Sequence, residues 1–277
     1  MPRAKKAPTS ASARDDPLKR TSGNASKKAK PATEKPIGKT NPEKPPAKDC
    51  QAGNYLLLVH LCDTYEPGIS RLLSIPPETT FDKLHEALQI AFGWANSHMH
   101  QFALAEESEI DPMMVGKTVL YLQTNGEDSA LSGLDVEVKE EAKYSLADIL
   151  DKAEYKGRTR LTYEYDMGDS WEHQICVLGR ADDHLGKTLG VNEFNQKLIC
   201  VTGEGHACAE DCGGPPGWED LKDTFKKTRG GDKYRKDWYK NVCLNGDKKG
   251  LDPYKWDILD VNARLADVST CTRIVAL

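Results

Sequence analysis

Two carboxylates and an imidazole lie close together near the middle of the chain. Asp166 ends a run in which apolar and polar residues alternate, Asp169 lies in the following turn, and His173 belongs to the next alternating run. Side chains two apart on a strand share a face, so Trp171 and His173 are expected on one side of a hairpin. Such a group could bind a divalent metal ion or perform acid–base chemistry. It also suits a tight turn around Gly168, with Trp171 and His173 as ordinary core residues.

A second acidic pair, Glu210 and Asp211, lies in a glycine-rich segment further along the chain. Glycine and acidic residues are poor core material, and the backbone of such a loop needs hydrogen-bonding partners. We therefore expect the loop to pack across the hairpin tip and to bring Asp211 close to His173 or Trp171. The candidate functional site is accordingly Asp166, Asp169, Trp171, His173, Glu210 and Asp211.

Two further groups of residues have the side-chain types of metal ligands. Three cysteines and a histidine suit zinc but match no standard motif with a paired Cys-x2-Cys, so reduced structural thiols are the alternative. His98 and His100 would share a face of a strand, as metal ligands often do. Alternatively, His98 lies in the preceding turn and His100 in a polar network. The candidate ligands of the cysteine set are Cys200, His206, Cys208 and Cys212.

Hydrophobic periodicity predicts the elements that must position these groups. Strands are expected over residues 55–61, 69–75, 100–104, 117–123, 161–167 and 171–178. Helices are expected over residues 81–92, 146–150, 218–227, 233–242 and 258–265. Strands and helices do not alternate strictly, which favours an α+β fold with a mixed, largely antiparallel sheet and packed helices in one globular domain, residues 50–277. Residues 202–217 are expected to form a loop, and residues 125–143 a surface excursion.

The first 49 residues differ in composition from the rest. They hold 13 Lys and Arg against 5 Asp and Glu and almost nothing large and apolar, so residues 1–49 are expected to be a disordered basic tail. Its clusters Lys19-Arg20 and Lys27–Lys30 resemble a nuclear-localisation signal, or they belong to a plain charged linker. The remaining residues are acidic, so nucleic acid would be contacted through the tail if at all. No membrane span or secretory signal is seen, which predicts an intracellular protein, in the nucleus or the cytoplasm, with reduced thiols.

Four motifs follow one another along the chain. They are Ala91-Phe92-Gly93-Trp94 through His98-Met99-His100, the hairpin from Tyr163 to His173, the loop Glu210-Asp211-Cys212-Gly213-Gly214, and Val261-Asn262-Ala263-Arg264-Leu265. In this order and spacing, residues 53–268 resemble the plasmid pRiA4b ORF-3-like family, whose members are similar to passenger proteins of plasmids and insertion elements. The resemblance implies a fold and no established activity. Cys208-Ala209 stands where the family usually has two prolines before the acidic pair.

Three functions remain open at this stage. One is a binding or scaffold module with a protein partner, whose tail serves targeting or nucleic-acid contact. Another is a metal-dependent hydrolase-like enzyme with a divalent metal as cofactor, in which five side chains should converge. The third is a mobile-element-associated DNA accessory protein, which needs a basic strip on the acidic body. No phosphate loop, dinucleotide fingerprint or nucleophile elbow is present to add another. The five side chains of the enzyme are Asp166, Asp169, His173, Glu210 and Asp211.

Overall fold

The computed structural model describes residues 53–107, 115–125, 136–188, 198–227 and 230–268 of the 277-residue chain. The predicted basic tail, residues 1–49, lies outside the described residues, and so do its two lysine-rich clusters. Within the described part, no helix has both the length and the apolar character needed to cross a membrane.

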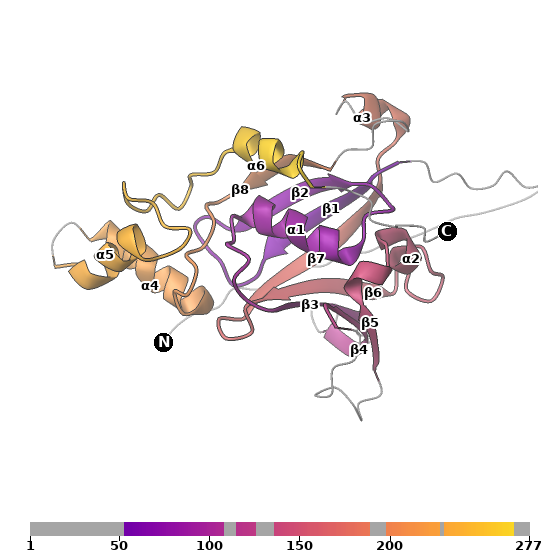
Figure 1. The fold of residues 1–277 in the computed structure, drawn as a ribbon, viewed down its shortest axis with the longest axis horizontal. Coiled ribbons are helices and arrows are strands. Elements are labelled where there is room, and N and C mark those ends of the chain that lie inside the picture. The colour runs from indigo at the N-terminus through magenta and orange to yellow at the C-terminus, as the bar shows by residue number, and fades with distance from the viewer. Residues whose placement is uncertain (1–52, 108–114, 126–135, 189–197, 228–229, 269–277) are drawn as a thin grey trace, which may run out of the picture. The chain divides into compact units, whose positions relative to one another are not determined.

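The described part of the chain is built on one sheet of eight strands in the order β5-β4-β3-β6-β7-β1-β2-β8 (Figure 1). All neighbouring strands are antiparallel except β4 and β5, which are parallel. The predicted mixed, largely antiparallel α+β fold is therefore confirmed. The strands are β1 (Tyr55–Leu61), β2 (Ile69–Ile75), β3 (His100–Glu107), β4 (Val115–Gln123), β5 (Glu137–Glu140), β6 (Thr159–Tyr165), β7 (Trp171–Arg180) and β8 (Ile199–Glu204).

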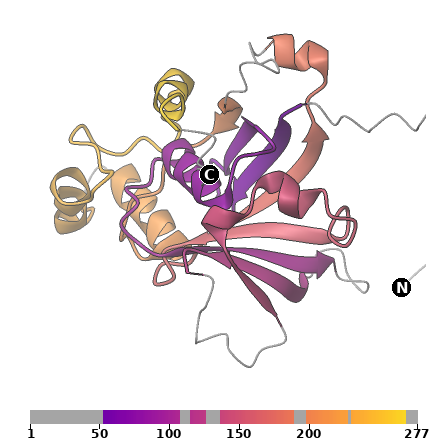
Figure 2. The ribbon, with the colours of Figure 1, turned by 45° about the vertical axis from the view of Figure 1, so that its right-hand side comes forward.

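One face of the sheet is covered by α1, with α6 beside it (Figures 1 and 2). The apolar residues of α1 recur at helical spacing and are buried against the inward-facing side chains of the strands, which forms the core. The helix ends at Gly93, whose positive φ of 71° suits a left-handed cap. The helices are α1 (Phe81–Phe92), α2 (Leu146–Leu150), α3 (Asp183–Thr188), α4 (Gly214–Lys226), α5 (Lys233–Asn241) and α6 (Ile258–Leu265), with a 3-10 turn η1 (Glu141–Lys143).

Two strands lie where the sequence predicts irregular structure. The predicted loop of residues 202–217 begins inside β8, because this strand pairs with β2 as far as Glu204. Gly203 permits that pairing, since a Cβ there would lie 2.6 Å from the carbonyl oxygen of Ser70. Likewise, β5 lies within the predicted surface excursion and pairs with β4 at the sheet edge. Short edge strands of this kind have little apolar periodicity of their own, so the sequence pattern does not reveal them.

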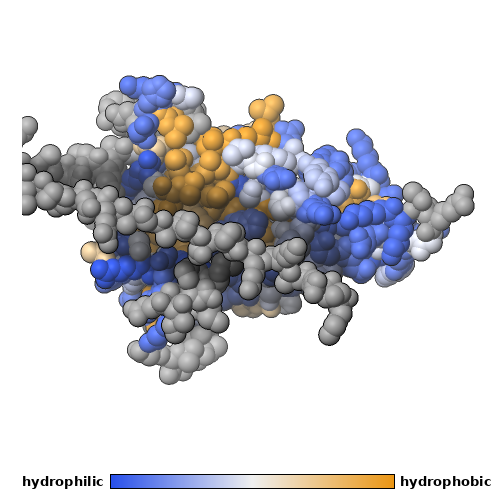
Figure 3. Space-filling view, turned by 180° about the vertical axis from the view of Figure 1, so that it is seen from behind, coloured by the Kyte–Doolittle hydropathy of each residue, from blue (hydrophilic) through white to orange (hydrophobic). Residues whose placement is uncertain are grey.

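The opposite face of the sheet carries apolar side chains that are open to solvent. Figure 3 shows these side chains gathered on the side of the molecule that faces away from α1. Leu56 and Leu58 of β1 are half-buried there, and Leu178 of β7 is 57% exposed. Antiparallel sheets normally turn a polar face to water, so this face differs from an ordinary solvent-exposed one.

Candidate functional site

The imidazole of His98 lies among three carboxylates that come from two separate segments. Its Nε2 is 3.1 Å from Oδ1 of Asp211, 3.6 Å from Oδ2 of Asp166 and 3.6 Å from Oε2 of Glu210. The ligand atoms of His98, Asp166 and Asp211 all lie within 4.8 Å of one another, and no other such group is found among the described residues. Three of the five side chains that the enzyme hypothesis requires thus converge: Asp166, Glu210 and Asp211. They converge around His98, which the hypothesis does not include.

The contacts of this imidazole are close in distance but poorly directed. His98 Nε2 is buried and has no hydrogen-bond partner, although the Asp211 oxygen is only 3.1 Å away. Among the described residues, no Lys or Arg forms an ion pair with any of the three carboxylates. The group therefore holds up to three negative charges with at most one positive charge from the imidazole, an imbalance that a bound cation would relieve.

Asp166 owes its position to the hairpin turn between β6 and β7. Its Oδ1 accepts the backbone N–H groups of Gly168 (3.0 Å) and Asp169 (3.4 Å), which leaves Oδ2 to face His98. The turn chemistry predicted for these residues is thus present, and it directs a carboxylate oxygen into the cluster. Asn96, Asp166 and Asp211 have φ values of 54°, 55° and 56°, so three non-glycine residues near the imidazole are left-handed. Strained backbone of this kind concentrates at functional sites.

Glu210 forms the buried wall of the cluster. Its side chain is fully buried, and Oε1 accepts the Ala95 N–H at 2.6 Å and the Tyr165 hydroxyl at 3.2 Å. The same hydroxyl accepts the N–H of Ser97 at 3.0 Å. Burial raises the pKa of Glu210, although the Ala95 and Tyr165 hydrogen bonds act in the opposite direction. The loop between α1 and β3, which carries His98, is thereby tied to Glu210 on both sides of Asn96.

Asn245 joins the two loops from behind. Its amide group donates to the carbonyl oxygens of Gly93 (3.1 Å) and Cys208 (2.7 Å), and its Oδ1 accepts the N–H of Glu210 (2.9 Å). One side chain thus satisfies backbone groups on both sides of the cluster. Sequence reasoning did not select Asn245, because a single Asn in a turn region is unremarkable without knowledge of its neighbours in space.

The acidic loop packs against the hairpin tip, as the sequence predicts. Oδ2 of Asp169 accepts the N–H of Gly213 at 3.0 Å. A Cβ on Gly214 would lie 2.4 Å from the carbonyl oxygen of Asp169, so only glycine allows this close approach. Asp169 therefore holds the loop in place, and the imidazole that Asp211 faces belongs to His98.

The other two predicted residues of the hairpin, Trp171 and His173, lie in the core and are fully buried. His173 donates from Nδ1 to the carbonyl oxygen of Trp171 (3.0 Å), and its Nε2 accepts the indole N–H of Trp94 (3.4 Å). Burial lowers the pKa of His173 to about 4, so the ring is neutral at physiological pH. Trp171 and His173 are therefore ordinary core residues, the second of the two possibilities that the sequence leaves open.

His85 and His173 should make the protein sensitive to acid. Burial lowers the pKa of each to about 4, whereas an unfolded histidine titrates near 6.5. Between these values the unfolded chain binds protons that the folded chain excludes, so the free energy of unfolding should fall as pH drops from about 6.5 to about 4. At the low end of this range, the loss of unfolding free energy is about 3 kcal/mol per histidine. Urea unfolding across this range measures it. A His173→Gln variant should show a shallower slope, and an unchanged slope would contradict this assignment.

The cysteine set does not form a cluster. No three of its four ligand atoms lie within 4.8 Å of one another in the described structure. Cys208 is fully buried, the Cys200 thiol donates to the carbonyl oxygen of Thr202, and the His206 ring stacks near Trp218. Burial raises the pKa of the Cys200 thiol to about 11 and holds the pKa of the Cys208 thiol well above its usual range, so both thiols are protonated at neutral pH. Protonated, buried thiols behave as small apolar residues.

His98 and His100 point to different networks. His98 lies in the loop before β3, whereas His100 begins β3 and pairs with Glu141 at 2.9 Å. The His100 ring stacks on His85, with 3.5 Å between the ring centroids and 4° between the planes. His98 is therefore a turn residue and His100 belongs to a polar network, which is the second possibility that the sequence leaves open.

The His85 network also positions the loop that carries His98. Gln89 donates to the Tyr163 hydroxyl (2.8 Å), so the hydroxyl proton is directed to Nδ1 of His85 (2.8 Å). The Nε2–H of His85 then donates to Oδ1 of Asn96 at 2.9 Å, while Oε1 of Gln89 accepts the Asn96 N–H at the same distance. Both ends of Asn96 are therefore held by α1, two residues before His98. Such outer hydrogen bonds orient the groups of a site.

Comparison with known proteins agrees with this fold. "Uncharacterized protein y4hQ" of Sinorhizobium fredii (strain NBRC 101917 / NGR234) is 25% identical over 159 residues, which is 57% of this chain and 66% of that protein, just under two thirds of its length. The crystal structure of MM3350, a protein of unknown function from Methanosarcina mazei Go1, is similar with a TM-score of 0.54 and 23% identity over 76% of this chain and 96% of that one. Residues 54–261 match the family described as plasmid pRiA4b ORF-3-like protein, and the chain belongs to this family.

Proposed function

We propose that His98, Asp166, Glu210 and Asp211 bind a divalent cation, and that the protein is a metal-dependent, hydrolase-like enzyme. The observation that supports this most directly is the buried Nε2 of His98, which lies 3.1–3.6 Å from three carboxylate oxygens without forming a hydrogen bond. Side chains around a cation point at a common centre, and they are therefore poorly aligned with one another. The cluster has this character.

The spacing and the charge of the cluster suit such an ion. Metal–ligand distances of about 2.1 Å in a tetrahedron put neighbouring ligand atoms about 3.4 Å apart, close to the distances around His98. One nitrogen and several carboxylate oxygens form a donor set of the kind that Zn²⁺ and Mn²⁺ accept. Three carboxylates and a neutral imidazole also leave enough negative charge to balance a divalent ion.

The exposure of the cluster on one side supports hydrolytic chemistry. The Asp211 side chain is 57% exposed, whereas the Glu210 side chain is fully buried. A substrate would therefore approach beside Asp211, where a bound ion would acidify a water molecule and generate a nucleophile. Asp211, as the exposed carboxylate, would then accept the proton of that water.

A metal-free cluster is the competing explanation. A protonated His98 would then neutralise part of the carboxylate charge by itself. Isothermal titration of the metal-stripped protein with Zn²⁺ and with Mn²⁺, together with metal analysis of the purified protein, separates the two. Binding of one ion per chain that disappears when the cluster residues are substituted supports the proposal. If neither ion binds at one site per chain, the cluster is structural.

A Glu210→Gln variant should bind the metal more weakly without losing stability. Glutamine can still accept the Ala95 N–H and the Tyr165 hydroxyl, and it removes a buried charge whose pKa is raised by burial. We expect metal affinity to fall about tenfold to a hundredfold, with a melting temperature no lower than that of the parent. Glu172→Gln serves as the control, because Glu172 lies on β7 outside the cluster. A variant that unfolds more easily but binds metal normally would contradict this role.

A further inference from the structure

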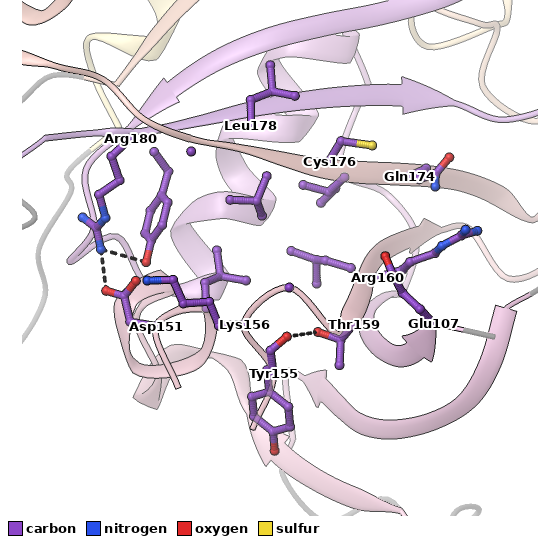
Figure 4. A pocket seen from close by; sticks show the side chains of 17 residues that line it. Glu107, Asp151, Tyr155, Lys156, Thr159, Arg160, Gln174, Cys176, Leu178 and Arg180 are labelled. Carbon is purple, nitrogen blue, oxygen red and sulfur yellow. Dashed lines mark hydrogen bonds and ion pairs between the residues drawn. The ribbon is translucent and has the colours of Figure 1, made fainter. Parts of the chain in front are cut away.

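The arginines in the wall of the pocket beside β7 lie next to acids. Figure 4 shows this pocket, which has a volume of about 810 Å³. At one end Arg180 pairs with Asp151 and donates to the Tyr55 hydroxyl at 2.8 Å. At the other end Arg160 lies beside Glu107 (Figure 4). These arginines are engaged within the wall and do not select a charged ligand.

A second hollow, of about 470 Å³, has a different balance of charge. It lies among the end of α4, the helix α5 and the turn that leads toward α6. Four lysines line it against two aspartates, so the lining is positive by two, although Asp and Glu outnumber Lys and Arg outside residues 1–49. The charged residues of the lining are Lys236, Lys240, Lys249, Lys255, Asp247 and Asp252.

Three of these lysines surround the Phe225 ring. Lys236 and Lys240 are four residues apart on one face of α5, and their Nζ atoms lie 5.5 Å and 6.0 Å from the centre of the ring. A Cβ on Gly250 would lie 3.4 Å from the ring, so the turn that carries Lys249 also borders it. Lysine side chains are long and flexible, and these three lysines around Phe225 can therefore reach a common anion.

The two acids of the hollow act on the fourth lysine. Lys255 pairs with Asp247 at 2.7 Å, and this hydrogen bond, together with the nearby Asp252, raises the pKa of Lys255. The three lysines around Phe225 form no ion pair with any residue that the structure describes. Lys236 donates to the carbonyl oxygen of Lys227 at 3.0 Å, which satisfies one of its three protons. The excess of positive charge thus lies around the ring.

We propose that this hollow binds a compact phosphate anion with about two or more negative charges, a phosphomonoester or a pyrophosphate group. Lysine binds phosphate as a point charge, and several ammonium groups around one spot suit an anion whose charge is concentrated. A nucleic-acid strand instead spreads single charges along its length. None of the four residues of the proposed metal site lines the hollow, so each site can be tested without the other.

Pyrophosphate is the probe, added to the full chain after metal has been stripped so that no bound ion contributes. We expect saturable binding at one site per chain in titration calorimetry. The affinity should fall as salt is added, because salt screens charges that are exposed to solvent. Absence of saturable binding at low salt would overturn the proposal.

Removing the three ammonium groups should weaken pyrophosphate binding about tenfold or more. The test variant combines Lys236→Gln, Lys240→Gln and Lys249→Gln. The control removes the same charge from exposed lysines outside the hollow, and it combines Lys152→Gln, Lys156→Gln and Lys187→Gln. Circular dichroism verifies that both variants fold. Equal affinity in the two variants would show that pyrophosphate binds elsewhere.

Asp252→Asn gives a test of opposite sign that does not depend on the triple variant. Oδ1 of Asp252 accepts the N–H of Tyr254 at 3.0 Å, and the oxygen of asparagine can accept it as well. Loss of this negative charge from the lining should strengthen pyrophosphate binding about threefold. Asp267→Asn, an exposed aspartate outside the hollow, is the control. An affinity that does not rise, or that rises equally in the control, would contradict the site.

A single-stranded oligonucleotide distinguishes the two sources of phosphate. The basic residues 1–49 attract such a strand in every variant, so the informative quantity is the difference between the triple variant and its control. We expect these two to bind the oligonucleotide equally while they differ for pyrophosphate. If the triple variant loses oligonucleotide binding as strongly as pyrophosphate binding, the hollow is part of a nucleic-acid surface and the assignment of a compact anion is wrong.

Discussion

A His98→Ala variant is expected to lose at least about two orders of magnitude in affinity for Zn²⁺ or Mn²⁺, because it removes the one nitrogen donor among three carboxylates. The imidazole is 28% exposed and its Nε2 makes no hydrogen bond, so the fold should survive. Titration calorimetry of the metal-stripped variant measures the change, and circular dichroism verifies the fold.

The control for this substitution is His60→Ala. His60 is an exposed histidine of β1 that does not belong to the cluster, and its loss should leave the metal affinity unchanged. In the parent, saturating metal should also raise the melting temperature, because the ion binds only the folded chain. If His98→Ala keeps the metal affinity of the parent, the imidazole is not a metal ligand. If His98→Ala unfolds, the loss of affinity is not informative, and the Glu210→Gln variant then tests the site.

An Arg71→Leu variant is expected to lose about 3–5 kcal/mol of unfolding free energy. Arg71 is 2% exposed and donates to the carbonyl oxygens of Ala91 (2.8 Å), Glu204 (2.5 Å) and Gly205 (2.8 Å). Its guanidinium also lies between aromatic rings, 4.5 Å from the centre of Trp256. Burial lowers the pKa of Arg71 to about 10, so the group remains charged at neutral pH. Leucine would leave these carbonyl groups without a donor.

The measurement is urea unfolding, with the exposed Arg158→Leu as the control. Arg71 connects the end of α1 to the end of β8, and both cluster-bearing loops start at these ends. Under conditions in which Arg71→Leu is fully folded, the variant should therefore still bind metal more weakly than the parent. A stability change below about 1 kcal/mol would mean that water replaces the guanidinium at the three carbonyls.

Much of the architecture was predictable because its signals are local. The bounds of β1, β2, α1 and α6 follow from alternation, helical spacing and the terminating Gly93, and the structure has them where the sequence predicts them. The hairpin was equally clear, since alternating runs flank a turn rich in Asp and Gly. By contrast, α4 begins at Gly214, inside the predicted loop of residues 202–217, because its two prolines are tolerated in the first turn of a helix.

The candidate site was only partly predictable, for a physical reason. Sequence patterns place side chains on a face of a strand, which is why Asp166 and the loop pair Glu210-Asp211 could be selected. They do not say which face is buried in the core, and the inward face of β7 takes His173 out of reach of solvent. The histidine that the carboxylates surround comes from a loop far away in the chain, and no periodicity connects His98 to Asp166.

The sequence by itself determined the α+β class, the strand hairpin and the acidic loop, because short-range propensities and turn chemistry decide these. The tertiary structure alone decided how the acidic loop packs on the hairpin tip, the convergence of His98 with three carboxylates and the clamp at Asn245. Each of these depends on long-range pairing, in which groups far apart in the chain meet because the sheet closes over a shared core. Pairwise proximity of this kind leaves no local trace in a single sequence.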